Sequence, residues 1–298
     1  MNILTINTVH HKGGAARIAR DLETGLKQAG HTVSFFAGSP SPMGSIVTLP
    51  KPLWERAFHK VLPSDCMGYN TAPLLNEGAF LSADLIHCHN LGGSFFHLPT
   101  LLRLQQNKPI VWTLHDMWPM TTGCPFTDTA LDQDGFYPCE EKTPPTWREK
   151  LVQQHQKSVK AKTYKELRAT IVCCSHWMEG KVRGSALGTQ STMVIHNGID
   201  LDVFAPVPKP EARRALNLPL DRPILLFISA GGKQDARKGW KYIEAAQTEI
   251  LKQYPNILFV NIGGNPDPAG DPPHLLSVPY VSDSSILAKY YSASDAFL

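Results

Sequence analysis

The chain has 298 residues, more than a single hydrophobic core usually holds, so two domains are expected. Apolar residues make up 42% and charged residues 18%, as in ordinary globular proteins, and a formal charge of +3 does not by itself indicate a nucleic-acid partner. No apolar run approaches the roughly 18 residues of a membrane-spanning helix. The first residues lack a basic region and a cleavage site, so no signal peptide is expected. The six cysteines lack CxxC spacing, which favours reduced thiols and a cytoplasmic location.

Strand and helix patterns alternate along the first two thirds of the chain. An apolar run at 2–7 predicts a strand, helical spacing of apolar residues predicts a helix over 15–29, and 31–38 reads as a second strand. This order predicts a parallel, right-handed strand–helix–strand unit. Further elements are expected as helices at 53–61, 98–106 and 147–168, and as strands at 83–89, 110–114, 169–175 and 192–196.

A domain boundary is expected near residue 205, because Pro206, Pro208 and Pro210 interrupt the pattern there. The predicted domains are therefore 1–205 and 206–298, both Rossmann-like α/β domains with parallel sheets. The second is expected to be incomplete, since three strands leave an open edge that natural folds normally cover. Its expected elements are strands at 224–229 and 257–262, helices at 239–254 and 283–293, and a strand that begins at 295–298.

The stretch 109–124, PIVWTLHDMWPMTTGC, is the first candidate for chemistry. The predicted strand 110–114 leads directly into His115 and Asp116, with no polar spacer. Ligands of open α/β sheets bind at the carboxyl ends of strands, so the pair is well placed, and Trp118 follows in an aromatic loop that can wall a pocket. A histidine that only caps a strand end explains the same pattern, and these residues alone leave both interpretations open.

Two glycine-containing turns are candidates for anion binding. Gly13 and Gly14 lie between the first strand and the first helix, where backbone N–H groups can approach an anion, although a tight turn explains them equally well. They do not form GxGxxG, and the second strand lacks a terminal carboxylate, so NAD is disfavoured. The segment 231–239, GGKQDARKG, opens a predicted helix, and its glycines and cations favour a diphosphate. Its three cations are Lys233, Arg237 and Lys238.

A zinc site is conceivable but disfavoured. His87 and His89 alternate along a predicted strand, so their rings are expected on one face. Adding His115, Cys124 and Cys139 gives enough ligand types for zinc, but none of them has metal-ligand spacing. No metal site is therefore predicted.

Two charged features have alternative interpretations. Asp132 and Asp134 resemble a metal-binding DxD, yet they lie in a polar loop, where such pairs are usually only solvated. The helix at 147–168 carries seven Lys or Arg against Glu149 and Glu166. It reads either as a solvated face or as a contact with an anionic membrane or a lipid-linked phosphate, where each cation adds about 1 kcal/mol.

Six motifs occur in order along nearly the whole chain. They are GGAARIARDL at 13–22, ADLIHCHN at 83–90, TLHDMWPMTTGC at 113–124, CCSHWMEGKV at 173–182, VIHNGIDLDVFAP at 194–206 and DARKGWKYIEAA at 235–246. Together they resemble the GT-B-fold glycosyltransferases of family 4, near the group that builds bacterial exopolysaccharides such as colanic acid. The resemblance implies two Rossmann-like domains facing a cleft. It also implies retaining transfer from a nucleotide-diphosphate sugar to a saccharide or lipid-linked acceptor, with no obligatory metal and no cofactor.

The resemblance also assigns expected roles to several residues. Gly13 and Gly14 would lie beside the reacting centre, and His115 would contact the transferred sugar. Arg237 and Lys238 would hold the diphosphate. Lys233 stands about where many members of the family carry a basic residue.

The chain ends at Leu298, before the Glu-x7-Glu motif that holds the donor in this family, so truncation is expected. Two functions follow. One is a cytoplasmic glycosyltransferase with peripheral contact to the inner membrane. The other is an inactive GT-B remnant that binds a sugar phosphate or a partner protein.

Overall fold

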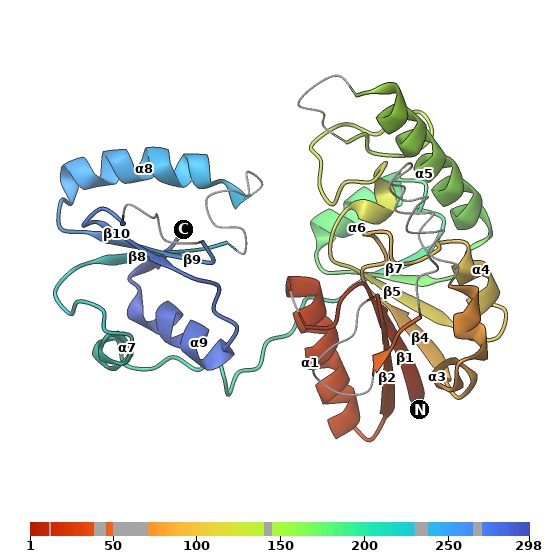
Figure 1. Ribbon diagram of the computed structural model, residues 1–298, viewed down its shortest axis with the longest axis horizontal. Coiled ribbons are helices and arrows are strands. Elements are labelled where there is room, and N and C mark those ends of the chain that lie inside the picture. Colours follow the sequence, from red (N-terminus) through yellow and green to blue (C-terminus); the bar gives the residue numbers. More distant parts are fainter. Residues whose placement is uncertain (12, 39–45, 50–70, 140–144, 230–237, 265–269) are drawn as a thin grey trace. The chain divides into compact units, whose positions relative to one another are not determined.

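The computed structural model describes residues 1–11, 13–38, 46–49, 71–139, 145–229, 238–264 and 270–298. They form two compact units, Met1–Gly198 and Ile199–Leu298, and each is built around a parallel sheet (Figure 1). The predicted α/β class with parallel sheets is confirmed. The boundary between the units lies after Gly198, somewhat before residue 205, where the prolines predicted it. The helix expected at 53–61 lies outside the described residues.

The described strands of the first unit form one parallel sheet in the order β3-β2-β1-β4-β5-β6-β7. The chain builds outward from β1 in one direction and then returns to add β4 on its other side. The order therefore reverses between β1 and β4, which is where doubly wound sheets open a crevice for ligands. The strands are β1 Asn2–Asn7, β2 Thr32–Ala37, β3 Ile46–Val47, β4 Leu85–Cys88, β5 Ile110–Leu114, β6 Thr170–Cys173 and β7 Ser191–Val194.

Helices cover the sheet of the first unit on its two faces. In Figure 1, α1 lies on one side of β1 and β2, and α3 and α4 lie on the other. The longest helix, α5, begins with a capping box in which Thr146 and Glu149 bond to each other's backbone N–H groups. The helices are α1 Gly14–Gln28, η1 Ala72–Asn76, α3 Gly78–Leu81, α4 Thr100–Leu104, η2 Trp118–Met120, α5 Trp147–Glu166 and α6 His176–Gly184.

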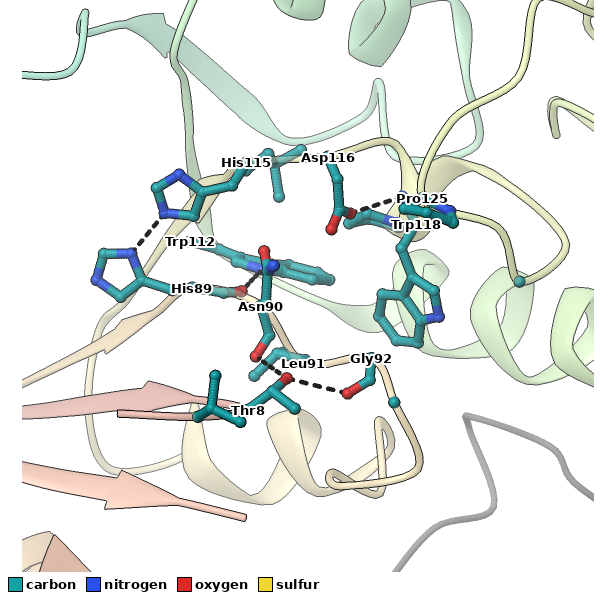
Figure 2. Close-up of a pocket in the computed structure, with 15 residues that line it drawn as sticks. Thr8, His89, Asn90, Leu91, Gly92, Trp112, His115, Asp116, Trp118 and Pro125 are labelled. Carbon is teal, nitrogen blue, oxygen red and sulfur yellow. Dashed lines mark hydrogen bonds between the residues drawn. The ribbon is translucent and has the colours of Figure 1, made fainter. Parts of the chain in front are cut away.

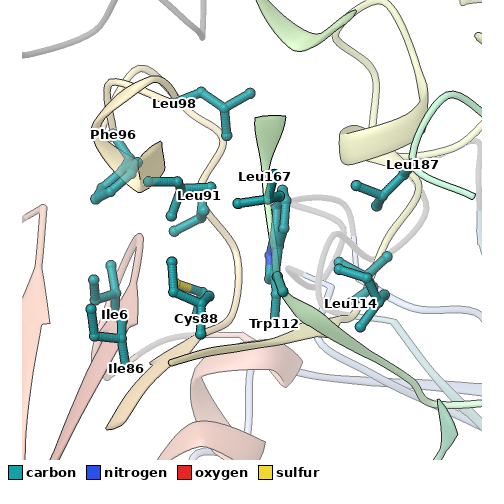
Figure 3. Packing of buried hydrophobic residues seen from close by; sticks show 14 of the residues in the cluster. Ile6, Ile86, Cys88, Leu91, Phe96, Leu98, Trp112, Leu114, Leu167 and Leu187 are labelled. Carbon is teal, nitrogen blue, oxygen red and sulfur yellow. The ribbon is translucent and has the colours of Figure 1, made fainter. Parts of the chain in front are cut away.

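The core of the first unit is centred on Trp112 in β5. This side chain is fully buried and lies near Cys88 of the neighbouring strand and Leu167 after α5 (Figure 3). Its indole Nε1 donates a hydrogen bond to the carbonyl of His89, at 2.8 Å. Packing in the core therefore also fixes the backbone just after β4, at the edge where the sheet order reverses.

The described strands of the second unit form a parallel sheet in the order β10-β9-β8-β11, which again reverses beside its first strand. The described residues thus contain four strands rather than the expected three. Strand β10 was missed because its short apolar run lies between Pro273 and Pro279 and reads as a loop. The elements are α7 Lys209–Ala215, β8 Ile224–Ile228, α8 Trp240–Gln253, β9 Leu258–Ile262, β10 Leu275–Val278, α9 Ser284–Ala293 and β11 Ala296–Phe297.

A buried arginine joins three segments of the second unit. Arg213 of α7 donates to the carbonyl of Ala293 at 2.9 Å and to that of Arg222 at 2.9 Å. It also pairs with Asp295 Oδ2 at 2.7 Å, and the same oxygen accepts from the backbone N–H of Ile224. The end of α9 and the start of β8 are thereby held against α7.

Candidate active site

A pocket of about 330 Å³ opens at the carboxyl ends of β1, β4 and β5 in the first unit (Figure 2). It lies where the strand order reverses, which is the expected ligand position in this class of sheet. It is lined by Thr8, Val9, His89, Asn90, Leu91, Gly92, Gly93, Trp112, Leu114, His115, Asp116, Trp118, Pro119, Gly123 and Pro125.

Hydrogen bonds tie together the loops that form the floor of the pocket. The N–H and the hydroxyl of Thr8 both donate to the carbonyl of Asn90, each at 2.9 Å. The same hydroxyl approaches the carbonyl of Gly92 at 3.0 Å, and the N–H of Asn90 donates to Asn7 Oδ1 at 2.9 Å. The loops after β1 and β4 are therefore bonded to each other as well as to their strands.

His115 and Asp116 follow β5 directly, and the structure places both in the pocket lining. One carboxylate oxygen of Asp116 accepts a hydrogen bond from the backbone N–H of Trp118 at 2.9 Å. This bond closes the turn that carries the tryptophan. Asp116 thus shapes the pocket wall, whereas the ring of His115 is available as a polar group within it. Their catalytic roles stay predictions.

Helix α5 holds the aromatic wall of the pocket from behind. The ammonium of Lys160 is fully buried, donates to the carbonyls of Trp118 and Thr121, and lies 4.0 Å from the centre of the Trp118 ring. The hydroxyl of Tyr164 donates to the carbonyl of Pro119 at 2.7 Å. The total charge of this helix, considered in the sequence analysis, does not distinguish one face from another. The structure shows that one face is buried, but most of its side chains are polar, so no apolar periodicity in the sequence marks it: Gln156, Lys160, Thr163 and Tyr164.

Three histidines form a contact cluster at the pocket, of which His89 and His115 line it. The rings of His87 and His89 are 4.3 Å apart, which confirms that they share a face, and His89 Nδ1 lies 2.9 Å from His115 Nε2. His87 Nε2 bonds the hydroxyl of Thr113 at 2.8 Å. Burial is the main cause that lowers the pKa of His87 to about 4, of His89 to about 2 and of His115 to about 4, and neighbouring rings contribute to the first two shifts. All three imidazoles are therefore neutral at pH 7.

The cysteines depart from the sequence expectation. Cys124 and Cys139 form a disulfide, with their Cα atoms 5.8 Å apart, so the expectation of reduced thiols is wrong for this pair. Their spacing alone gave no sign of it, because the loop between them lacks a periodic pattern. Cys88, Cys173 and Cys174 are free. Across the described parts of the chain, no group of three His, Cys, Asp or Glu side chains is arranged to hold a metal ion.

Asp132 and Asp134 are engaged by a cation from α5 rather than simply solvated. Lys157 Nζ lies 2.7 Å from Asp132 and 2.5 Å from Asp134. Partial burial pushes the pKa of Asp132 upward. The hydrogen bonds from Lys157 and from the N–H groups of Phe136 and Asp134 outweigh this and leave that pKa below its usual value. The pair anchors the 124–139 loop to the helix.

The predicted glycine turn lies close to the pocket in sequence but not in its lining. Gly13 precedes α1 with φ of +93°, a conformation that favours glycine, and Gly14 is the first residue of the helix. A Cβ added to either residue would meet nothing within 4 Å among the described residues.

The predicted diphosphate turn belongs to the second unit. Lys238 is exposed and directly precedes Gly239, which adopts φ of +74° and caps the N-terminus of α8. This N-terminus follows β8, the strand beside which the sheet order reverses. Lys233 and Arg237 lie outside the described residues.

The fold is that of a doubly wound α/β protein with a pocket at the carboxyl edge of its first sheet. The model of Glycosyltransferase Family 4 matches residues 12–203, more than half of the chain, and the chain belongs to this family. It is also similar to the D-inositol 3-phosphate glycosyltransferase of a Nocardioides species, with 38% identity over 80 residues. That match covers 26% of this chain and 17% of the relative's length.

Solved structures share the GT-B fold of the chain at low sequence identity. Sucrose-phosphate synthase from Thermosynechococcus elongatus aligns with a TM-score of 0.63 and 20% identity, over 99% of this chain and 74% of that one. Anabaena HepE in complex with UDP-glucose gives 0.60 and 12%, over 99% and 72%. Trehalose-6-phosphate synthase OtsA gives 0.59 and 13%, over 100% and 78%. None of the described helices combines the length and the apolar content needed to cross a bilayer.

Proposed function

We propose that this chain transfers a sugar, with retention of configuration, from a nucleotide-diphosphate sugar to a saccharide or lipid-linked acceptor in polysaccharide biosynthesis. The observation that carries the proposal is the pocket at the strand-order reversal, with His115 in its lining, inside the region that matches the family. The solved HepE complexes contain UDP and UDP-glucose and share the fold, which supports a uridine-diphosphate donor.

The leaving diphosphate gains negative charge as the glycosidic bond breaks, so donors and cations aimed at it lower the barrier. Lys238 directly precedes the N-cap residue of α8, and in this proposal its ammonium adds a cation to the partial positive charge of that helix N-terminus. In this proposal Lys233 and Arg237 add charge from the same turn. In this proposal the absence of side chains at Gly13 and Gly14 allows the donor to approach the start of α1 closely.

His115 acts on the sugar as a neutral hydrogen-bonding group. Burial holds its pKa near 4, so at neutral pH the ring carries no charge and is not a proton donor of general-acid type. A neutral imidazole can bond a sugar hydroxyl with directional specificity. Asp116 contributes by fixing the turn that follows, through its bond to Trp118.

An exposed aromatic pair next to the pocket supports a saccharide acceptor. The rings of Phe126 and Trp177 lie 6.4 Å apart and are nearly parallel, and they are 45% and 51% exposed. Phe126 follows Pro125, which lines the pocket and whose carbonyl accepts from the N–H of Met117 at 2.8 Å. Flat apolar ring faces left open to solvent mark interaction sites, and the apolar face of a sugar ring fits them.

The start of α5 supports contact with an anionic membrane or a lipid-linked phosphate. Trp147 is 67% exposed and carries the guanidinium of Arg148 over its ring at 5.3 Å. The cations of α5 that remain exposed are Arg148, Lys150, Lys162 and Lys165, whereas Lys157 and Lys160 are bonded inward. We accordingly propose a cytoplasmic enzyme that docks peripherally on the inner membrane.

The test incubates the chain with UDP- and GDP-sugars and a panel of saccharide and polyprenyl-phosphate-linked acceptors, and measures nucleotide release. The anomeric proton of the product, read by NMR, gives the stereochemistry. We expect release that depends on an acceptor and a product that retains the donor configuration. A thermal-shift screen with UDP, GDP and NAD accompanies the assay. Stabilisation by a nucleotide without nucleotide release for any acceptor would instead identify an inactive remnant. Stabilisation by NAD alone would exclude both the transferase and the remnant.

A further inference from the structure

His89 is buried against the one pocket residue that is expected to contact the sugar. Its side chain is 1% exposed, and its Nδ1 lies 2.9 Å from Nε2 of His115, with the two ring planes only 12° apart. Figure 2 shows the two rings facing each other, with His89 below His115. The other nitrogen of His89, Nε2, is buried and has no hydrogen-bond partner among the described residues.

The proton between the two rings can be bonded either to His115 Nε2 or to His89 Nδ1. If His115 Nε2 donates, the single proton of His89 must sit on its own Nε2, and a buried N–H then has no acceptor. If His89 Nδ1 donates, Nε2 of His89 is only an unused lone pair. Orphaned buried N–H groups are rarer in folded proteins than unused acceptors, so the second arrangement is favoured.

A doubly protonated His89 does not provide a third arrangement. The charged ring would leave its Nε2–H without an acceptor and would lie 4.3 Å from the ring of His87. Burial, together with the neighbouring rings, lowers the pKa of His89 to about 2, so the neutral form is the relevant one.

We propose that His89 is a positioning residue that donates its Nδ1–H to His115 and thereby fixes His115 as the tautomer protonated on Nδ1. His115 then presents a hydrogen-bond donor from Nδ1, for which the structure records no partner among the described residues. The substrate group that fits is an acceptor oxygen, such as a hydroxyl of the transferred sugar. This last step rests on the proposed function, whereas the tautomer does not.

The direct test is NMR of the full chain with histidine labelled by ¹⁵N in the ring, using two-bond ¹⁵N–¹H correlations at pH 7 without ligand. The 12 histidines are assigned by the signals lost in His115→Gln and His89→Asn. We expect His115 to show a protonated Nδ1 and an unprotonated Nε2, and His89 a protonated Nδ1. A His115 protonated on Nε2 overturns the proposal, whatever the chain's activity.

Variants separate positioning from simple packing. The amide of Asn places an N–H near the former Nδ1, so His89→Asn is expected to keep the tautomer of His115, whereas His89→Phe removes the donor and is expected to lose it. His87→Asn is the matched control, since His87 bonds Thr113 rather than His115. Where turnover is measurable, we expect KM for the nucleotide sugar to rise about tenfold in His89→Phe and to be rescued in His89→Asn. An unchanged His115 tautomer in a folded His89→Phe contradicts the proposal.

Discussion

The two units use a buried cation in different ways. In the second unit, Arg213 bonds the carbonyls of Ala293 and Arg222 and the carboxylate of Asp295, so one side chain connects segments far apart in sequence. In the first unit, Lys160 bonds the carbonyls of Trp118 and Thr121 within a single turn. Arginine has five donors in a fixed fork and lysine has three on a compact head. Arg213 therefore stabilises the packing of the second unit, whereas Lys160 stabilises one wall of the pocket.

Because the two cations bond different parts of the chain, their loss is expected to have different consequences. Each site satisfies a buried charge with backbone carbonyls, and each leaves those carbonyls unpaired if the cation is lost. Loss of Arg213 removes a connection that the whole second unit needs. Loss of Lys160 frees the loop that carries Trp118, which lines the pocket beside His115. The first change should therefore act on folding, and the second on both folding and ligand binding.

The largest expected effect is that of Arg213→Met. Removing the guanidinium leaves Asp295 without its inner partner and several carbonyls unsatisfied, so we expect the second unit to lose about 4 kcal/mol of unfolding free energy. Hydrogen exchange of the β8 amides measures this, with Arg214→Met, an exposed neighbour, as the control. If exchange in β8 is as slow as in the control, Arg213 is not a structural tie.

Lys160→Met is expected to have a somewhat smaller effect on stability, because fewer bonds are lost. Two carbonyls lose a charged donor, and Trp118 loses its cation, which together predict about 3 kcal/mol in urea unfolding of the first unit. Lys162→Met, on the exposed side of the same helix, should change stability by no more than about 0.5 kcal/mol. Equal effects of the two substitutions would show that the wall does not depend on Lys160.

The histidine cluster predicts a pH dependence that belongs to the first unit. His87, His89 and His115 have folded pKa values below the ordinary value of 6.5. As the pH falls below 6.5, the unfolded chain therefore binds protons that the folded chain does not, and stability declines. The decline is steepest down to about pH 4, where His87 and His115 protonate in the folded state too, and it is shallower below that, where His89 alone of the three stays neutral. Each histidine that stays neutral contributes a slope of about 1.4 kcal/mol per pH unit. His89→Asn should flatten the urea-midpoint profile over this window, and an identical profile would contradict the cluster's burial.

The sequence predicted those parts of the fold that depend on local pattern. Strands β1 and β5 appear at the residues expected, because each is a mostly apolar run of strand length with polar residues at its end. The position of His115 and Asp116 at a pocket also followed, since the end of a strand fixes where the next residues lie. Strand β10 was missed because prolines flank it.

The parts that could not be predicted depend on contacts between distant segments. The hydrogen bond between His89 and His115 joins two strand ends, and their sequence positions give only the shared edge. Lys160 looks like any other cation of a charge-rich helix until the loop that it bonds is in place. The Cys124–Cys139 disulfide depends in the same way on the path of an unpatterned loop, which composition does not determine.

The central proposal is that His115 hydrogen-bonds the sugar of the donor and that Lys238 binds its diphosphate. Calorimetric titration of UDP and of UDP-glucose into the wild type, His115→Ala and Lys238→Ala tests it most directly. We predict that Lys238→Ala weakens both ligands by about 2 kcal/mol, the scale of a charged hydrogen bond, and that His115→Ala weakens UDP-glucose alone, by about 1 kcal/mol. Equal weakening of UDP and UDP-glucose by His115→Ala, or no change in either, would contradict the account.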